Sequence, residues 1–393
     1  MKNRLMTIGI LILLIPGIVF LAGCINPYTP ETGGVITETT GVPVKTPSPE
    51  SVQTLTPNST VKTAIPTSMP LTPISSTYND NCSPVTISQS DGTQVTLPCQ
   101  PRRIIVTNAN AAEMLIAIGA GDRIVGVTDS TENVTYIMDK LSGVEDIGNW
   151  QIPNIERILS LHPDVVIAYS SYKPKNLDQL TAVNITVVFL DCYKLNQLPS
   201  DARALGTLTG KTAEAESYAQ MVENTTNLIA QRVHTIPPDQ YPSAYFESYT
   251  DYTAASRGSG SDDMLKASGG KNIAGDTLYS STQVSPEWVV SQKPDFVMKV
   301  VSSSETRSLA EIVQILKDRS GWNTIPAVQD NQVYAISNDV EYGPRAYIGL
   351  VYMAKILHPD VFRDVDPRKM LDEYAQKFVA EANIETPVYP APK

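Results

Sequence analysis

The chain has 393 residues, with 41 acidic and 30 basic side chains, a formal net charge of −11 at pH 7 and 42% hydrophobic residues. The acidic balance, without any basic stripe along the sequence, argues against a nucleic acid as partner. The length is sufficient for two lobes that each bury a sizeable core.

The N-terminal sequence MKNRLMTIGILILLIPGIVFLAGC combines a short basic start, an apolar run from Leu5 to Ala22 and small residues before a cysteine. This pattern is typical of an export signal. Its last four residues resemble the lipobox of exported lipoproteins, so we expect residues 1–23 to be a signal peptide and Cys24 to carry lipid. The alternative is an uncleaved membrane anchor, because the run approaches the ~20 residues that span a bilayer. Both interpretations place the remaining chain outside the cytoplasmic membrane.

Residues 24–79 are rich in threonine, proline and serine and contain few large apolar side chains. Such a segment cannot bury enough apolar surface to offset the entropy lost on ordering, so we expect a disordered tether. Glycosylation of the exported chain stays open at five N-x-S/T sequons, which lie at Asn58, Asn81, Asn133, Asn184 and Asn224.

Two cysteines, Cys82 and Cys99, flank two alternating runs that meet at Asp91-Gly92. This pattern predicts a β-hairpin at the start of the first lobe. Cysteines at the two feet of a hairpin lie close enough to bridge, and an exported chain permits a disulfide, so we expect this pairing. The remaining Cys192 is then expected to be a small buried residue after a strand.

Strand-like runs alternate with helical segments from residue 102 onward, as in RRIIVTN, DRIVGVTD, DVVIAYS and ITVVFLD. Near-continuous apolar strands of this kind indicate a parallel sheet covered on both faces by helices. After residue 240 the pattern restarts with SAYFESY, DFVMKVV and QVYAISN. We therefore expect an α/β fold with two doubly wound, Rossmann-like lobes, over residues 80–209 and 237–393.

One long α-helix is predicted to join the two lobes, within residues 210–236. The stretch from Thr212 to Val233 contains no proline or glycine, has Thr212 in the N-cap position, and ends before Pro237. Its ~22 residues correspond to a rod of about 33 Å. A single helix between lobes should resist large hinge motion, so we expect a largely preformed ligand cleft between them.

Several sequence patterns resemble those of enzymes or metal sites but lack the spacing or the structural context that these sites require. GTLTGKT at 206–212 is one residue too short for a P-loop and follows a helix rather than a strand. His162, His234 and His358 lack metal-ligand spacing, and RGSGS at 257–261 is no nucleophile elbow. We expect no catalysis, no metal bound directly by the protein and no cofactor, although a metal inside a ligand stays open.

Other stretches together resemble one family. The region VTISQSDGTQVTLPCQPRRIIVTNANAAEMLIAIGAGDRIVGVTD, the long helix, ASGGKNIAGD at 267–276 and GPRAYIGLVYMAKILHPDVF at 343–362 resemble the substrate-binding proteins of ABC importers for ferric siderophores, haem and cobalamin. The likeness covers roughly residues 83–380. It implies two α/β lobes bridged by one helix, a small-molecule ligand between the lobes, and an ABC permease with its ATPase as partners.

A repeated phrase, NIERILSLHPDVVI at 154–167 and SPEWVVSQKPDFVM at 285–298, puts a glutamate in the first turn of a helix that precedes a strand. The resemblance implies that Glu156 and Glu287 dock onto arginines of the permease, as the equivalent glutamates do in cobalamin-binding members. Glutamate in a first turn also stabilises the helix dipole without any partner, so both roles stay open.

The resemblance also places the ligand beyond the carboxyl ends of the strands. Trp150 matches a cleft tryptophan of the cobalamin-binding members, and Tyr169 follows a strand. Asp339 and Glu341 are expected near the rim. From the second lobe, five further ligand-binding side chains are expected, namely Tyr249, Tyr252, Arg257, Tyr342 and Arg345. Aromatic faces suit a bulky planar or apolar ligand, and arginines suit its carboxylates, phosphates or catecholates. The alternative is that some of these tyrosines simply cover the core.

We therefore expect a lipid-anchored, monomeric binding protein on the outer face of the cytoplasmic membrane that captures an iron(III) chelate and delivers it to an ABC permease. Two cleft arginines and many tyrosines favour a siderophore-type chelate over cobalamin or another corrinoid, and no paired histidine or methionine favours haem. The alternative from another class is an envelope interaction protein that has kept the fold without transport, whose cleft would bind no chelate.

Overall fold

The computed structural model describes residues 82–275, 282–379 and 386–392, all within one compact unit that spans residues 69–393. The predicted signal peptide, Cys24 and the tether lie outside the described residues, as do Asn58 and Asn81. Among the described residues, no helix has the length and apolar character needed to cross a membrane.

A β-hairpin opens the described chain. Its strands β1 (Val85–Ser88) and β2 (Gln94–Leu97) are antiparallel, and Cys82 is disulfide-bonded to Cys99 with 5.4 Å between the Cα atoms. The hairpin turn is held against the first lobe because the Phe189 amide donates to the Gln89 side chain over 2.7 Å. The hairpin is thus an integral part of that lobe.

The first lobe contains a parallel sheet of five strands in the order β5-β4-β3-β6-β7. The order reverses between β3 and β6, so the connections leave the sheet in opposite directions at this point and open a crevice beyond the strand ends. The strands are β3 (Ile104–Val106), β4 (Ile124–Val127), β5 (Glu145–Asp146), β6 (Val165–Ala168) and β7 (Val187–Phe189). The helices are α1 (Ala109–Ala117), α2 (Thr135–Met138), α3 (Ile155–Ser160), α4 (Leu177–Ala182) and α5 (Leu198–Thr209).

The second lobe has a mixed sheet of seven strands, in which β8, β10, β12 and β13 are parallel while β9, β11 and β14 pair antiparallel at its edges. Its strands are β8 (Ser243–Glu247), β9 (Thr253–Ala254), β10 (Lys271–Asn272), β11 (Thr282–Gln283), β12 (Phe296–Val301), β13 (Val333–Ser337) and β14 (Val388–Tyr389). Its helices are α7 (Gly260–Ala267), α8 (Pro286–Gln292), α9 (Leu309–Lys317), α10 (Pro326–Gln329), α11 (Asn338–Glu341), α12 (Ala346–Leu357) and α13 (Pro367–Tyr374).

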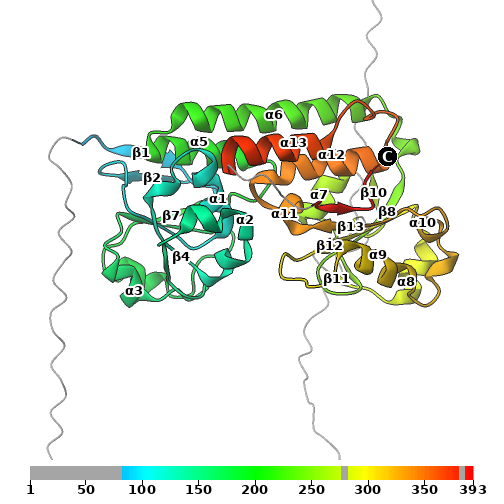
Figure 1. Cartoon of the computed structure of the whole chain (residues 1–393), viewed down its shortest axis with the longest axis horizontal. Helices are drawn as coiled ribbons and strands as arrows, with labels where there is room; N and C mark the ends of the chain where they lie inside the picture. Colours follow the sequence, from blue (N-terminus) through cyan, green and yellow to red (C-terminus); the bar gives the residue numbers. More distant parts are fainter. Residues whose placement is uncertain (1–81, 276–281, 380–385, 393) are drawn as a thin grey trace, which may run out of the picture. The chain divides into compact units, whose positions relative to one another are not determined.

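The helix α6 (Thr212–His234) joins the lobes and runs beside both of them, along the top of Figure 1. Its 23 residues correspond to about 34 Å. The expected N-cap at Thr212 is wrong, because the cap is Lys211, which makes no side-chain cap hydrogen bond. Since α5 ends at Gly210 in a left-handed conformation with φ of +70°, a single residue is left to turn the chain into α6.

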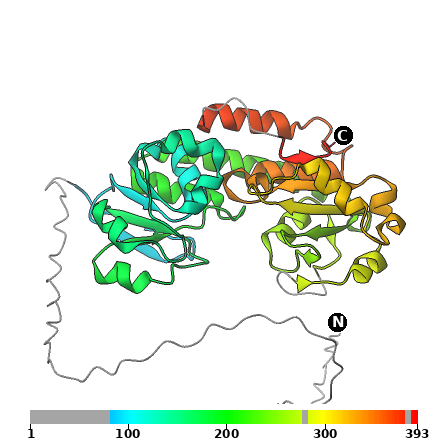
Figure 2. The same cartoon turned by 60° about the horizontal axis from the view of Figure 1, so that its bottom comes forward.

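In the central strands, side chains alternate between two buried clusters. In β3, Ile104 and Val106 belong to one cluster and Ile105 to another; in β8, Phe246 and Tyr245 divide in the same way. The cluster on the α6 side is continuous through both lobes and includes side chains of α1, α5, α6, α7, α12 and α13. The two outer clusters are confined to one lobe each. Figures 1 and 2 show the two sheets as separate groups of strands. The helices on the α6 side therefore connect the core of one lobe to that of the other.

Candidate ligand-binding site

A cavity of about 660 Å³ lies between the two lobes, within the size range of small-molecule sites. On the first lobe, its lining residues follow the carboxyl ends of all five strands of the parallel sheet. On the second lobe, they follow β8, β12 and β13. The cavity therefore occupies the crevice that doubly wound sheets provide for ligands.

The first lobe presents an aromatic wall to this cavity. Trp150, Tyr169 and Tyr172 contact one another edge to face, with ring centroids 5.6 to 6.5 Å apart. Tyr193 extends the wall, 5.9 Å from Tyr169, and meets Tyr342 of the second lobe at 6.3 Å. Edge-to-face pairs hold each ring in a defined orientation, so the wall presents a fixed aromatic surface to a ligand.

The loops that carry these rings are held by specific bonds. Gly148 has a φ of +83°, which favours glycine, and turns the chain between β5 and Trp150. Asp191 accepts hydrogen bonds from the amides of Ser170 and Ser171, each over 2.9 Å, and pairs with Lys194 at 2.8 Å. Burial alone would raise the pKa of Asp191, but its bonds with Lys194 and Ser171 hold that pKa below its ordinary value. The anchored carboxylate fixes the loop after β6.

A buried polar cluster crosses from one lobe to the other along the cavity. Glu113 of α1 accepts hydrogen bonds from Tyr136 and, over 2.7 Å, from Tyr374 of α13. Arg345, which ends the short 3₁₀ helix η6 (Gly343–Arg345), places its Nε 3.2 Å from Glu113 and its Nη2 3.6 Å from Asp339. Its guanidinium also lies 3.8 Å from the Tyr136 ring centroid. The pairing links α1 of the first lobe to α11, η6 and α13 of the second.

The charge of Arg345 is matched within the protein. Its side chain is 1% exposed, and although burial lowers its pKa, electrostatic interactions with Tyr136, Glu113 and Asp339 more than offset this and keep the pKa above its ordinary value. Among the described lining residues, the charged ones are two carboxylates and this one guanidinium. The cavity therefore carries a formal charge of minus one rather than a positive surface.

The structure brings five of the seven expected ligand-binding residues to the cavity, namely Trp150, Tyr169, Tyr249, Tyr342 and Arg345. Tyr252 and Arg257 are not among its lining residues. The Tyr252 ring covers the Arg319 guanidinium at 4.3 Å instead, and Arg257 donates to the Gly275 carbonyl over 3.0 Å. Asp339 lines the cavity as expected at the rim, but Glu341 is buried and bonded to Ser261.

Some lining residues were not predicted from the sequence, among them Asn110, Glu113, Tyr136, Tyr172, Tyr193, Ser302 and Ser303. Tyr193 and Ser302 could have been found by taking the residues directly after every apolar strand. Glu113 could also have been noticed in the sequence, because a single acidic residue within the apolar helix sequence AAEMLIAI must be either exposed or paired. No such indication exists for Tyr136, since it lies in the four-residue helix α2, which has no side-chain cap hydrogen bond to mark its start.

The two glutamates of the repeated phrase are both exposed in the first turns of short helices. Glu156 lies in α3 after its N-cap Asn154, and Glu287 lies in α8 after its N-cap Ser285. Both helices lie on the side of their lobes away from α6 (Figure 1). Each glutamate is therefore free to meet a partner while it also stabilises its own helix.

Comparison with known proteins matches residues 104–340 to a family described as periplasmic binding protein. The chain is 28% identical over 289 residues to the uncharacterized ABC transporter substrate-binding lipoprotein YvrC of Bacillus subtilis, which covers 72% of this chain and 88% of that one. It is 28% identical over 216 residues to a vitamin B12-binding protein of Yersinia pestis, over 54% of this chain and 74% of that one.

Among solved structures, the molybdate-bound protein MolA of Haemophilus influenzae matches with a TM-score of 0.65 and 24% identity, covering 76% of this chain and 99% of that one. This likeness is one of fold. The two-lobed architecture, the cavity at the strand ends and the family match over residues 104–340 agree, and the chain belongs to the periplasmic binding protein family, among the substrate-binding proteins of ABC importers.

Proposed function

We propose that this protein captures a bulky metal chelate without net negative charge, with a corrinoid as the first choice, and presents it to an ABC permease outside the cytoplasmic membrane. Anchoring through a lipid on Cys24 is part of this proposal. The observation that carries it is the combination of a fixed aromatic wall with a cavity whose single described cation, Arg345, is already paired with Glu113.

This proposal reverses the order of ligands that the sequence favoured. The preference for a siderophore-type ferric chelate rested on two cleft arginines and many tyrosines, but Arg257 does not line the cavity and the charge of Arg345 is offset by Glu113 and Asp339. An anionic ligand would meet uncompensated negative charge in a partly desolvated site, which costs binding free energy. A corrinoid with uncharged amide groups or a cationic ferric trihydroxamate meets no such cost. The similarity to a vitamin B12-binding protein gives the corrinoid further support.

Calorimetric titration of the purified protein tests the ligand class. The probes are cyanocobalamin, a cationic ferric trihydroxamate, an anionic ferric tris-catecholate, haem and molybdate. We expect saturable binding of cyanocobalamin or the trihydroxamate and much weaker binding of the anions. Tight binding of the tris-catecholate or molybdate would overturn the proposal for the ligand, and no binding of any probe would favour the envelope interaction protein instead.

Trp150 provides a second readout. Trp150→Ala removes an aromatic face from the wall and should weaken binding by about tenfold, since aromatic contacts of this kind contribute about 0.5–1.5 kcal/mol beyond burial. Trp150→Phe keeps an aromatic ring and should retain most of the affinity. Equal affinities of both variants and the wild type would remove Trp150 from the site.

Docking through Glu156 and Glu287 is tested by charge reversal. Glu156→Arg and Glu287→Arg should abolish ligand uptake by cells and leave binding by the purified protein unchanged. The matched control is Glu214→Arg, because Glu214 is also an exposed first-turn glutamate, on α6. If the control impairs uptake equally, the glutamates act only on helix stability and the docking role is wrong.

A further inference from the structure

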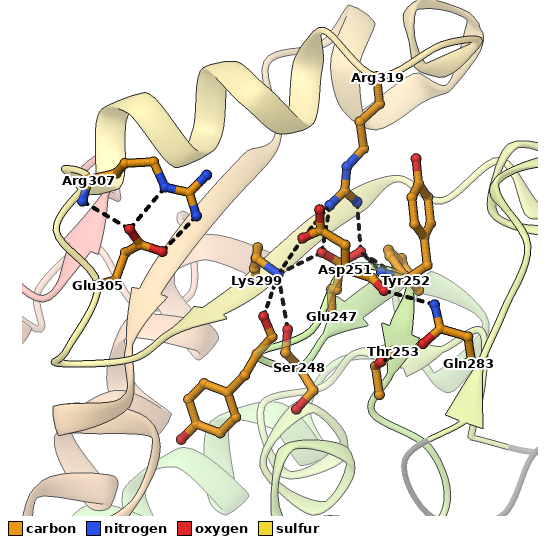
Figure 3. Close-up of polar contacts among 12 residues, drawn as sticks. Glu247, Ser248, Asp251, Tyr252, Thr253, Gln283, Lys299, Glu305, Arg307 and Arg319 are labelled. Atoms are coloured by element: carbon orange, nitrogen blue, oxygen red, sulfur yellow. Dashed lines mark hydrogen bonds and ion pairs between the residues drawn. The ribbon is translucent and has the colours of Figure 1, made fainter. Parts of the chain in front are cut away.

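A cluster of ion pairs joins Glu247, Asp251, Lys299 and Arg319 next to the loop between β8 and β9 (Figure 3). This loop also carries Tyr249, which lines the cavity. Glu247, the last residue of β8, is fully buried and pairs with Lys299 of β12 at 2.8 Å. Arg319 donates two hydrogen bonds to the same carboxylate, over 2.7 and 2.9 Å. The side chains of both cations are 8% exposed. A buried ion pair contributes little net stability compared with apolar packing. We therefore ask which parts of the chain this pair positions.

The cluster fixes the backbone of the loop between β8 and β9. Lys299 donates to the carbonyls of Ser248 and Tyr249, over 3.1 and 3.2 Å. Glu247 accepts from the Tyr252 amide over 2.9 Å. Asp251 lies 3.2 Å from the Lys299 amine and 2.9 Å from an Arg319 nitrogen. The loop is therefore bonded to the cluster from Ser248 to Tyr252, and Tyr249 cannot shift without disturbing these bonds.

The far side of this loop is bonded to the strand that leads into the docking helix. The Tyr252 carbonyl accepts from the Val284 amide over 2.8 Å, and the Gln283 side chain donates to the Asp251 carbonyl over 2.9 Å. Val284 directly precedes Ser285, the N-cap of α8, whose first turn carries Glu287. These two hydrogen bonds connect the loop that carries Tyr249 to the segment that leads into α8 and Glu287.

In the first lobe, the covalent chain itself connects a cavity residue to an exposed glutamate. Trp150 of the cavity wall lies on the connection between β5 and α3, which leads directly to Glu156 in the first turn of α3. This connection is held by a hydrogen bond from the Asn154 amide to the Ile147 carbonyl, over 2.9 Å. Each lobe thus ties one aromatic cavity residue to one exposed helix-start glutamate, although the two lobes use different bonds.

We propose that the Glu247–Lys299–Arg319–Asp251 cluster couples the cavity loop at Tyr249 to the start of α8. A ligand in the cavity would then change the mobility of the chain around Glu287. This inference rests on the proposed function, because Glu287 is taken as the docking residue. Lys299, Arg319 and Asp251 act as positioning residues. A permease that contacts Glu287 would then distinguish the ligand-bound protein from the empty protein through this lobe.

Hydrogen–deuterium exchange of the full-length protein tests the coupling. In the absence of ligand, Lys299→Met should speed exchange about tenfold both in residues 248–253 and in residues 282–290, because hydrogen bonds to a charged group are lost. Asp251→Asn is the gentler variant, since that side chain is 62% exposed, and it should give a smaller change in the same two segments. The matched control Gln314→Ala breaks only a surface bond within the α9 region and should change neither.

The probe cyanocobalamin then completes the test. Ligand should slow exchange in both segments of the wild type, and Gln283→Ala should keep the slowing in residues 248–253 but lose it in residues 282–290. If Lys299→Met and Asp251→Asn change exchange in residues 248–253 but not in residues 282–290, the coupling is wrong. This result does not depend on which ligand the protein binds. Calorimetric failure to bind any probe would instead overturn the proposed function, and the ligand-free comparison would still decide the coupling.

Discussion

Arg345 sets the electrostatic character of the cavity through the carboxylates that face it. Because Glu113 and Asp339 together outweigh its charge, we propose that the residue does not act as the anion receptor that an arginine in a cleft suggests. Removal of either carboxylate leaves the guanidinium less compensated and moves the cavity toward a positive charge.

Asp339→Asn should therefore improve the binding of an anionic ferric tris-catecholate relative to cyanocobalamin by about tenfold, the effect of a charge–charge interaction of roughly 1.4 kcal/mol at a partly exposed site. Competition titration measures the ratio directly. Glu113→Gln should shift the ratio in the same direction, but at a larger cost in stability because Glu113 is buried and bonded to Tyr374. An unchanged ratio in both variants would mean that charge does not select the ligand.

Glu341 gives the folded protein a distinct pH dependence. Its side chain is buried, with Oε2 lacking a hydrogen-bond partner among the described residues, and burial raises its pKa from 4.5 to about 8. The folded state therefore binds a proton that the unfolded chain releases between these two values. The contribution of Glu341 to stability is therefore fully present below pH 4.5, falls as the pH rises toward about 8, and then levels off.

Glu341→Gln should flatten this part of the stability profile, because the amide imitates the protonated acid. Urea unfolding midpoints followed from about pH 5 to about pH 8 measure the slope. Asp201, whose pKa burial raises to about 6, contributes in the same direction only at the acid end of the range. A profile that keeps its slope in Glu341→Gln would assign the pH dependence to other groups.

The residues of the site were partly predictable. Trp150, Tyr169 and Tyr342 follow or flank elements whose ends the hydrophobic pattern marks clearly. Tyr252 and Arg257 were wrongly grouped with them for geometric reasons. Tyr252 adopts a φ of +58° and turns onto Arg319, and neither this backbone conformation nor the buried cation beneath it can be read from the local sequence. Proximity in sequence to a strand end does not determine which way a side chain points.

At the scale of elements, the long strands and α6 were predictable because their apolar pattern and lack of breakers are local properties. The short strands β9, β11 and β14 were not, since each exists only through its partner in the sheet. The N-cap of α6 was misplaced by one residue for a similar reason. The close packing of α5 on α6 around Gly206 determines where the turn between them falls.

The contact of α12 with α11 offers a test of how an element supports the site. A Cβ on Gly349 of α12 would overlap the carbonyl oxygen of Val340 in α11, which lies between Asp339 and Tyr342. Gly349→Ala should therefore lower the free energy of unfolding by about 1–3 kcal/mol and also weaken ligand binding. Chemical denaturation and calorimetry measure the two effects.

The control is Gly260→Ala, at the start of α7, where an added Cβ meets only a Tyr342 ring carbon at 3.4 Å. This variant should leave the unfolding free energy unchanged or raise it slightly, because alanine restricts the unfolded chain. If Gly349→Ala is as stable as the control, α11 and α12 are free to move apart and the site is less rigid than its packing indicates.

For the whole molecule, the decisive feature is the apolar core on the α6 side, which runs without interruption through both lobes. Neither lobe can unfold without exposing part of the core of the other. Thermal unfolding should therefore follow a single transition, with equal calorimetric and van't Hoff enthalpies, and a bound ligand should raise the midpoint of the whole transition. Two resolved transitions, only one of them ligand-sensitive, would contradict this expectation.

The same shared core also affects how well the folded protein resists proteolysis. Proteases cleave a native chain chiefly through partly opened forms, and those forms are rare when opening one part requires opening all of it. A binding protein that we propose to work outside the cytoplasmic membrane is exposed to such enzymes throughout its life. With one core for two lobes, cleavage within the folded layers is limited by global unfolding, and degradation is confined to surface segments until that happens.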